Sequence, residues 1–382
     1  MLGSLQPVDV RPARVVVVRT CGVNVDVETT LCDDVVELAT GGEVDGVSLN
    51  IHENDVIALV GESGCGKTTL GKAAIGLHRP TEGTVSYRGQ DVWKTKDNSS
   101  FWRNDAGEIP YSEIRRSLQM IHQDPGSSLN ANYTVESLLS APLKKWESDL
   151  ELADRQARIY GLLEYVGMTL AEDYANRYPH QLSGGEQQRV ALIRALLVNP
   201  DLILADEAIS ALDVSLRVEV MDLLLALQEQ FGTSFLFVSH DLSNARYLAE
   251  RADGRIGVMY LGKLVEVGPP EQIINDPRHP YTKVLRWATG DMRSTREVEE
   301  PPLRSLDIPD PVDPPSGCSF HTRCPEAREA CKKETPALIE CRDGQRAACF
   351  REDEEHAYWD SDPLGEAETD RTTATDSEDA TA

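Results

Sequence analysis

Positive charge is scarce in this chain of 382 residues, in which 38 lysines and arginines stand against 64 aspartates and glutamates. Only ten of the 38 basic residues are lysines, and the formal net charge is −26. Proteins that bind the phosphate backbone of nucleic acid over a wide surface need clustered positive charge, so this composition disfavours a nucleic-acid partner. Because salt screens dense charge, an acidic, lysine-poor surface suits a salt-rich cytosol, and we hypothesise a halophilic source.

The sequence also lacks long apolar stretches. No uninterrupted run approaches the roughly 18 residues that a transmembrane helix needs. The first stretch, MLGSLQPVDVRPARVVVV, lacks the basic, apolar and small-residue parts of a signal peptide. We therefore expect a cytoplasmic protein, in which structural disulfides are disfavoured.

Short apolar runs alternate with helical patterns over much of the chain. VIALVG (56–61), DLILAD (201–206) and SFLFVS, which begins at residue 234, have the character of buried strands, and helical stretches lie between them. This alternation predicts a parallel, doubly wound sheet. The valine-rich residues 1–45 predict edge strands with loops. Residues 351–382 carry twelve acids and two arginines, which predicts an acidic, disordered tail.

The stretch GESGCGKTT (61–69) matches the phosphate-binding pattern G-x-x-x-x-G-K-[ST] in full. Its glycines let backbone N–H groups turn inward around a phosphate, and the following helix points its positive dipole end at the same anion. Lys67 would reach the β- and γ-phosphates, and the Thr68 hydroxyl would bind Mg²⁺. The residues expected to contact the nucleotide here are Gly61, Glu62, Ser63, Gly64, Cys65, Gly66, Lys67, Thr68 and Thr69.

Two carboxylates end the apolar stretch DLILADE (201–207). Open α/β sheets bind their ligands at the carboxyl ends of parallel strands, where both this stretch and the phosphate loop would lie. We expect Asp206 to hold Mg²⁺ and Glu207 to polarise the water that attacks the γ-phosphate.

A second anion-binding helix start is present in LSGGEQQR (182–189), where Ser183, Gly184 and Gly185 precede a helical run. One nucleotide has a single γ-phosphate, which the first loop already serves. The economical explanation is that this second site contacts a nucleotide held by another subunit.

In combination, these motifs resemble the ATP-binding subunits of ABC transporters. The order along the chain is the phosphate loop, Gln123 in MIHQDP, LSGGEQQR, Asp206–Glu207, SALD (210–213) and His240 in VSHD. The resemblance implies an α/β fold with a P-loop NTPase (RecA-like) core in a nucleotide-binding domain over residues 1–290. It also implies a helical subdomain at about residues 124–190, a small cysteine-rich C-terminal extension, and two ATP molecules sandwiched between two such domains.

The resemblance also assigns roles to individual residues. The catalytic residues that it implies are Lys67, Gln123, Glu207 and His240. The residues that it implies for Mg²⁺ are Thr68, Gln123 and Asp206. Those implied to contact the partner's nucleotide or to lie at the dimer interface are Ser183, Gly184, Gly185 and Asp213.

Further strings resemble the ATPase subunits of dipeptide and oligopeptide importers, nearer the "F" type. They include YPHQLSGGEQQRVALIRAL and HPYTKVL (279–285). The resemblance implies a peripheral protein at the cytoplasmic face of the membrane, which works with a second ATPase subunit, two transmembrane permeases and an extracellular solute-binding protein. An importer for nickel or a sugar, and a non-hydrolysing subunit that completes a partner's ATP site, remain as alternatives.

The chain departs from the family in two places. Residues 1–60 contain no Phe, Tyr or Trp, whereas the family usually stacks an aromatic side chain on adenine. We expect weaker adenine binding or another stacking residue. Ala208-Ile209 replaces the usual Pro-Thr after Glu207, and neither pair carries chemistry. Altered loop packing is therefore expected, with hydrolysis retained.

Five of the eight cysteines lie between residues 318 and 349, behind a proline-rich linker, in a segment that we delimit as 291–350. The residues alone leave disulfides, zinc, an iron–sulfur cluster and unligated thiols open. The subfamily resemblance favours a 4Fe–4S cluster held by Cys318, Cys324, Cys331 and Cys349, with Cys341 as the spare. We expect this lobe to lie apart from the ATP site.

Overall fold

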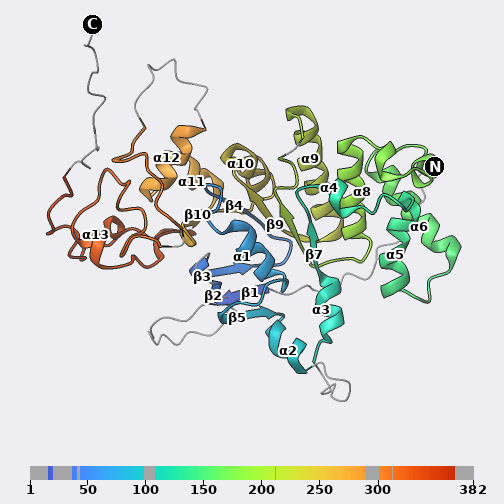
Figure 1. Ribbon diagram of the computed structural model, residues 1–382, viewed down its shortest axis with the longest axis horizontal. Helices are drawn as coiled ribbons and strands as arrows, with labels where there is room; N and C mark the ends of the chain where they lie inside the picture. The colour runs from blue at the N-terminus through green and yellow to red at the C-terminus, as the bar shows by residue number, and fades with distance from the viewer. Residues whose placement is uncertain are drawn as a thin grey trace, which may run out of the picture.

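The computed structural model describes residues 16–19, 37–40, 44–98, 108–210, 212–289, 301–311 and 313–365. A mainly parallel sheet runs through the centre of the molecule, in the strand order β12-β13-β11-β10-β4-β9-β8-β7 (Figure 1). Its parallel strands are β4 (Val56–Val60), β7 (Leu118–Ile121), β8 (Leu202–Asp206), β9 (Ser234–Ser239) and β10 (Arg255–Tyr260). Every residue of β4, β8 and β9 is buried, as expected for parallel strands covered on both faces.

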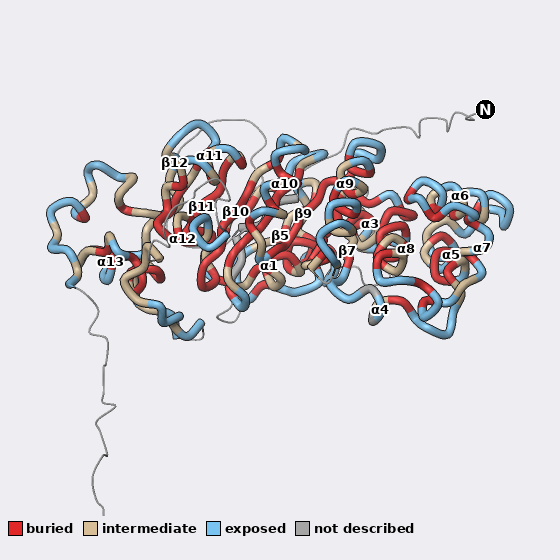
Figure 2. The backbone as a smooth tube through the Cα atoms, turned by 90° about the horizontal axis from the view of Figure 1, so that it is seen from above, coloured by how far each residue is buried: buried red, intermediate tan, exposed pale blue. Residues whose placement is uncertain are grey.

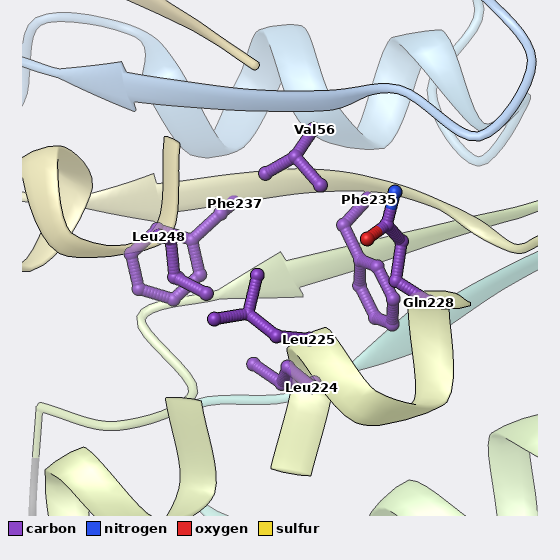
Figure 3. Close-up of a pocket in the computed structure, with 7 residues that line it drawn as sticks. All are labelled: Val56, Leu224, Leu225, Gln228, Phe235, Phe237 and Leu248. Atoms are coloured by element: carbon purple, nitrogen blue, oxygen red, sulfur yellow. The ribbon is translucent and has the colours of Figure 1, made fainter. Parts of the chain in front are cut away.

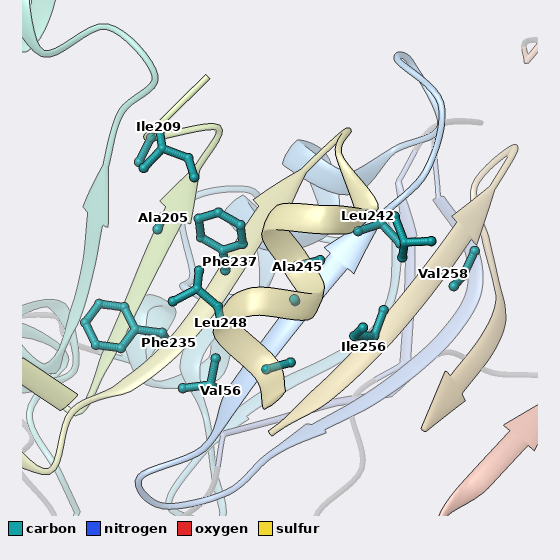
Figure 4. Close-up of a cluster of buried hydrophobic side chains, with 14 of the residues drawn as sticks. Val56, Ala205, Ile209, Phe235, Phe237, Leu242, Ala245, Leu248, Ile256 and Val258 are labelled. Atoms are coloured by element: carbon teal, nitrogen blue, oxygen red, sulfur yellow. The ribbon is translucent and has the colours of Figure 1, made fainter. Parts of the chain in front are cut away.

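Helices cover both faces of this sheet. On one face, α10 (Leu242–Arg251) places Ala245 and Leu248 against Val56 and Phe237 of the strands (Figure 4). On the other face, α1 (Lys67–Ala74) packs between the main sheet and a second sheet. Further helices of this part are α2 (Val92–Asn98), α3 (Tyr111–Ser117), α9 (Val214–Phe231), α11 (Pro270–Asn275) and α12 (Pro280–Ala288). The buried residues concentrate along the strands in Figure 2. The predicted P-loop NTPase architecture is confirmed.

The second sheet has five strands, all paired antiparallel. They are β1 (Val16–Arg19), β2 (Glu37–Thr40), β3 (Val44–Ile51), β5 (Glu82–Tyr87) and β6 (Gln90–Asp91). Both β1 and β2 pair with β3 and with β5, so they lie end to end between these two strands. The strands expected in residues 1–45 are therefore present, but the expectation that they form an edge was wrong.

A helical subdomain projects from the end of the main sheet near β7 (Figure 1). It consists of α4 (Pro125–Ser128), α5 (Val135–Trp146), α6 (Leu152–Tyr165), α7 (Ala171–Ala175), a 3₁₀ turn at Pro179–Gln181 and α8 (Gly184–Leu196). It has its own cluster of buried residues, which includes Leu139, Ile159 and Ile193. These helices extend from Pro125 to Leu196. Among the described helices, none is both long and apolar enough to cross a bilayer.

The cysteine-rich segment forms a lobe at the opposite end of the molecule (Figure 1). It contains α13 (Ala330–Lys333), the hairpin of β12 (Ile339–Arg342) and β13 (Gln345–Ala347), and a 3₁₀ turn at Phe350–Glu352. Strand β13 pairs with β11 (Lys263–Gly268), so the lobe extends the main sheet.

The tail was expected to be disordered from residue 351, but the structure describes it as far as residue 365. Tyr358 is buried and its hydroxyl donates to the carbonyl of Glu326, while Leu364 N–H donates to the carbonyl of Ala327. A buried aromatic side chain and a backbone hydrogen bond therefore attach this acidic stretch to the lobe. Residues 366–382 lie outside the described part of the chain.

A small apolar cavity lies beneath α9 and α10 (Figure 3). Its lining includes Val56, Leu224, Phe235 and Leu248, with the amide of Gln228 at its side. That amide donates to the carbonyl of Asn54, so it does not offer its donor to the cavity. The cavity is an imperfection in the packing of the core and not a binding site.

Candidate nucleotide-binding and hydrolysis site

The phosphate loop connects the end of β4 to the start of α1. Gly61 is required here because a Cβ at this position would stand 2.2 Å from the carbonyl oxygen of Met259 on β10. Gly66, just before α1, has φ 96°, a conformation that favours glycine. The Lys67 side chain is buried and its ammonium donates to the carbonyls of Gly61 and Glu62, each at 2.8 Å. A bound phosphate would compete for this same ammonium.

The Cys65 thiol lies 3.6 Å from the Lys67 ammonium. Burial raises the pKa of this thiol, and the nearby ammonium opposes that change. The thiol is thus kept in its neutral form within the loop.

Thr68 and Asp206 meet at the carboxyl edge of the main sheet. The Thr68 hydroxyl donates to Asp206 Oδ1 at 2.7 Å, although the two residues are 138 positions apart in the sequence. Mg²⁺ prefers oxygen ligands and usually takes one or two from the protein, with the rest from phosphates and water. The hydroxyl and the carboxylate fit the Mg²⁺ that the fold family uses.

Glu207 lies between Gln123 and His240. The Gln123 side-chain amide donates to Glu207 Oε2 at 3.2 Å, and His240 Nδ1 lies 3.7 Å from Glu207 Oε1. Glu207 has φ 47°, in the left-handed region that costs free energy for a residue with a side chain. Its N–H donates to the carbonyl of Val238 on β9, which holds this conformation. The structure therefore brings together Gln123, Glu207 and His240, three of the four side chains expected to be catalytic.

The two residues after Glu207 pack into the core. Ala208 and Ile209 are buried in the hydrophobic cluster that includes Phe237, and Ile209 is labelled in Figure 4. They contribute packing to the loop and no polar group to the site.

The residues of the LSGGEQQR motif (182–189) stand at the start of α8, in the helical subdomain. Ser183 caps the helix: its hydroxyl accepts from Glu186 N–H, and the Glu186 carboxylate accepts from Ser183 N–H. Gly184 and Gly185 form the first turn. Figures 1 and 2 place α8 with α5 at one end of the molecule and α1 near its middle, so the two glycine-rich helix starts of one chain are apart. Asp213 caps α9 by accepting from Leu216 N–H.

Two residues that sequence reasoning missed also contact the phosphate loop. The hydroxyl of Tyr281, on α12, accepts from Glu62 N–H at 2.9 Å. The guanidinium of Arg323, in the cysteine-rich lobe, donates to both carboxylate oxygens of Glu62 at 3.1 and 3.0 Å. The expectation that the lobe lies apart from the ATP site was wrong, because Glu62 and Arg323 form an ion pair across that boundary.

The four cysteines expected to hold a cluster share one lobe as free thiols. Burial raises the pKa of the thiols of Cys318 and Cys349, to about 11 and about 12, and it also raises the pKa of Cys324 and Cys331. Four thiols suit iron and sulfur by type and number. Within the described residues, however, no three His, Cys, Asp or Glu side chains are arranged to hold a metal ion. The donor set fits a 4Fe–4S cluster and the side-chain arrangement does not.

Comparison with known proteins shows to which family the chain belongs. The family described as "ABC transporter" matches residues 44–210, and the "Oligopeptide/dipeptide transporter, C-terminal region" matches residues 265–331. The oligopeptide transport ATP-binding protein AppF of Bacillus subtilis is 39% identical over 80% of this chain and 88% of its own length. The dipeptide transport ATP-binding protein DppF of Haemophilus influenzae is 38% identical over 81% of this chain and 89% of its own length. The oligopeptide transport ATP-binding protein OppF of Salmonella typhimurium is 39% identical over 77% of this chain and 84% of its own length.

The solved structure of cbiO1 from Clostridium perfringens, part of an ABC transporter complex, superposes with a TM-score of 0.53. It covers 70% of this chain and 92% of its own, at 20% identity, and supports the fold.

The fold and the site define an ABC-type ATPase, and this chain belongs to the ATP-binding subunits of ABC transporters. Within that family its relatives are the F-type proteins AppF, DppF and OppF, and it shares their C-terminal region.

Proposed function

We propose that this protein hydrolyses MgATP to energise an ABC importer for dipeptides or oligopeptides. The observation that carries the proposal is the convergence of Thr68 with Asp206 and of Gln123 with Glu207 and His240 at one edge of the sheet. The match of residues 265–331 to the C-terminal region of oligopeptide and dipeptide transporters favours peptides over nickel or sugars.

Each of these residues has a definite task in hydrolysis. Lys67 would exchange its loop carbonyls for the β- and γ-phosphates. Thr68 and Asp206 would hold Mg²⁺, and the bound ion would supply positive charge that offsets the phosphates. Gln123 and His240 fix the Glu207 carboxylate from two sides. Glu207 then orients the attacking water and accepts its proton.

We propose that the working unit pairs this chain with a second ATPase subunit. Ser183, Gly184, Gly185 and Asp213 would serve the nucleotide bound by that partner, because they lie away from the chain's own phosphate loop. The dimer would drive two transmembrane permeases at the cytoplasmic face of the membrane, supplied by an extracellular solute-binding protein.

Glu207→Gln tests this function. Loss of a general base lowers the hydrolysis rate by about 10²- to 10⁴-fold. ATP binding should persist, so the variant should accumulate as an ATP-bound dimer in size-exclusion chromatography. Glu229→Gln removes the same charge at an exposed position of α9 and serves as the control. Normal hydrolysis by Glu207→Gln would contradict the catalytic assignment, and hydrolysis by neither variant nor the parent would favour a non-hydrolysing subunit.

We further propose that the lobe takes up a 4Fe–4S cluster through Cys318, Cys324, Cys331 and Cys349. The four cysteine thiols support this proposal by their type and number. Because their side chains are not arranged around a metal in this structure, they would have to change position and lose their protons when the cluster binds. Anaerobically purified protein should contain iron and show a visible absorption band that dithionite bleaches. Protein that contains zinc and no iron would overturn the proposal, and Cys341→Ser should leave the iron content unchanged.

The halophilic source is a proposal that rests on composition. A surface with a formal net charge of −26 repels itself, and salt screens that repulsion. Stability should therefore rise with potassium chloride up to molar concentrations. Thermal unfolding at increasing salt measures this, and an unchanged midpoint would count against the idea.

A further inference from the structure

Glu62 of the phosphate loop is held by the C-terminal part of the chain from two directions. Its N–H donates to the Tyr281 hydroxyl at 2.9 Å, and its carboxylate accepts two bonds from the Arg323 guanidinium. Its carbonyl accepts from Lys67, the residue expected to bind the phosphates. Backbone donor, backbone acceptor and side chain of Glu62 are therefore all engaged, and two of the three partners lie beyond residue 280.

Arg323 is fixed in the position that this contact needs. Only 4% of the residue is exposed, and its guanidinium lies near the rings of Tyr260 and Phe320, at 5.8 and 5.9 Å from their centres. Its carbonyl accepts from Arg304 N–H in the linker. A buried guanidinium that contacts two rings has few alternative positions, so its charge is directed at Glu62.

Tyr281 is anchored through a separate set of contacts. His279 precedes α12 and its Nδ1 accepts from Tyr281 N–H at 3.1 Å. The buried carboxylate of Glu266, on β11, accepts from the N–H of His279 and from the side-chain amide of Gln345 on β13. A chain of contacts thus runs from the lobe's hairpin through β11 and α12 to the phosphate loop.

We propose that the C-terminal extension positions the phosphate loop, with Arg323 and Tyr281 acting as positioning residues through Glu62. This inference rests on the assignment of residues 61–69 as the phosphate-binding loop. A triphosphate brings several negative charges to a loop that already carries the Glu62 carboxylate. Arg323 offsets that carboxylate, and Tyr281 fixes the peptide whose carbonyl holds Lys67. ATP binding therefore depends on both residues. Without Arg323, the unpaired Glu62 carboxylate would repel the triphosphate, and such repulsion falls off slowly in a partly buried site.

The experiment is a double-mutant cycle between Arg323 and Glu62, measured on the full chain. Arg323→Gln should raise the KM for MgATP by about tenfold, which corresponds to about 1.4 kcal/mol, with little change in kcat. Glu62→Gln removes the repelling charge, so Glu62→Gln/Arg323→Gln should return the KM to within about threefold of the parent value. Arg323→Lys keeps the charge and should fall between the parent and Arg323→Gln.

Arg328→Gln is the matched control. Arg328 is another lobe arginine, and it donates to the carbonyls of Trp359 and Ser361 within the lobe, with no contact to the loop. It should change the stability of the lobe and leave the KM unchanged. Direct titration with a fluorescent ATP analogue gives the same comparison without hydrolysis, so failure of this inference is distinguishable from failure of the proposed ATPase function.

Two results would overturn the proposal. One is a KM of Arg323→Gln that equals the parent value or that Glu62→Gln does not correct. The other is an equal change in KM for Arg328→Gln, which would show a general effect of a loosened lobe. If Arg323→Gln fails to fold, Tyr281→Phe decides the matter. It removes one hydroxyl, and a KM raised about threefold supports the proposal, whereas an unchanged KM contradicts it.

Discussion

The nucleotide-binding core and the cysteine-rich lobe are stabilised by different means. In the core, two large clusters of buried side chains cover the two faces of the main sheet, and each draws on residues from distant parts of the sequence. In the described part of the lobe, the cluster formed by its own residues consists of Ala330, Cys331, Phe350 and Tyr358. The most deeply buried aromatic residue of the lobe, Phe320, belongs instead to a cluster of the core.

This contrast shows that the lobe depends on the core for its stability. A segment of this size buries too little apolar surface to fold on its own without a staple such as a metal. Here the attachment is supplied by Phe320, by the ion pair of Arg323 with Glu62 and by the pairing of β13 with β11. The same contacts that hold the lobe also reach the phosphate loop.

The largest expected effect is on the hydrolysis rate of the core, and it should leave the stability of the core and of the lobe almost unchanged. Lys67→Met removes the ammonium expected to bind the phosphates, and loss of one such electrostatic contact typically lowers the rate by about 10²- to 10³-fold. Hydrolysis should fall by this factor while thermal unfolding changes little. Lys72→Met removes a charge from the same helix and is the control. A rate that survives Lys67→Met would show that the loop does not bind the γ-phosphate.

The next effect tests whether the lobe and the core are one cooperative unit. Phe320→Ala leaves a cavity between Tyr260 and Tyr281 and should lower the free energy of unfolding by about 3 to 5 kcal/mol. It should also make the lobe sensitive to limited proteolysis. Phe350→Ala, in the lobe's own cluster, should expose the lobe to protease while the core keeps its melting temperature. Equal behaviour of the two variants would mean that the lobe has no special attachment at Phe320.

Acid should loosen the connection through α12. Burial, with the positive charges of Lys283 and Arg351, lowers the pKa of His279 to about 3. Below about pH 6.5, His279 binds a proton in the unfolded chain but not in the folded chain. The contribution of His279 to stability is therefore fully present above about pH 6.5 and is lost as the pH falls toward 3. Between pH 7 and pH 5 this loss amounts to about 2 kcal/mol.

His279→Asn should remove that part of the pH dependence while an asparagine oxygen still caps α12. Chemical denaturation of parent and variant at the two pH values measures the difference. A parent and a variant with the same difference between pH 7 and pH 5 would exclude His279 as the cause.

The smallest effect concerns a contact that also joins lobe and core but is exposed. Arg342 on β12 lies 2.5 Å from Asp276, and 48% of each side chain is exposed. Surface ion pairs of this kind contribute little, so Arg342→Gln should change the free energy of unfolding by less than about 0.5 kcal/mol. A loss comparable with that of Phe320→Ala would mean that exposed charge holds the lobe.

Much of the core and its site could be predicted from the sequence, for physical reasons. Strands β4 and β8 are buried on both faces and therefore appear as continuous apolar runs. Because parallel strands bring their carboxyl ends to one edge, residues that follow these runs meet in space. That is why Thr68 and Asp206, and Glu207 with its neighbours, could be expected together.

The lobe could not be predicted in the same way. Strands β12 and β13 are short and partly polar, and nothing local in them indicates β11 as a partner. The ion pair of Arg323 with Glu62 spans 261 positions, and each residue has an ordinary role in its own motif. Neither residue belongs to a periodic sequence pattern that would indicate the other as its partner. The disordered tail was expected from its acidic residues, and Tyr358 shows that one aromatic side chain can attach such a stretch.

The pairing of β13 with β11 has a consequence for shortened forms of this protein. A chain cut near residue 290 would leave one side of β11 with a free row of N–H and C=O groups, and such exposed strands tend to pair with other molecules. The shortest self-contained form should therefore extend beyond Ala347 and include Phe350 and Tyr358 of the lobe's own cluster. Any tag or fusion partner placed between Ala288 and Ala347 would have to leave this strand's own partner intact.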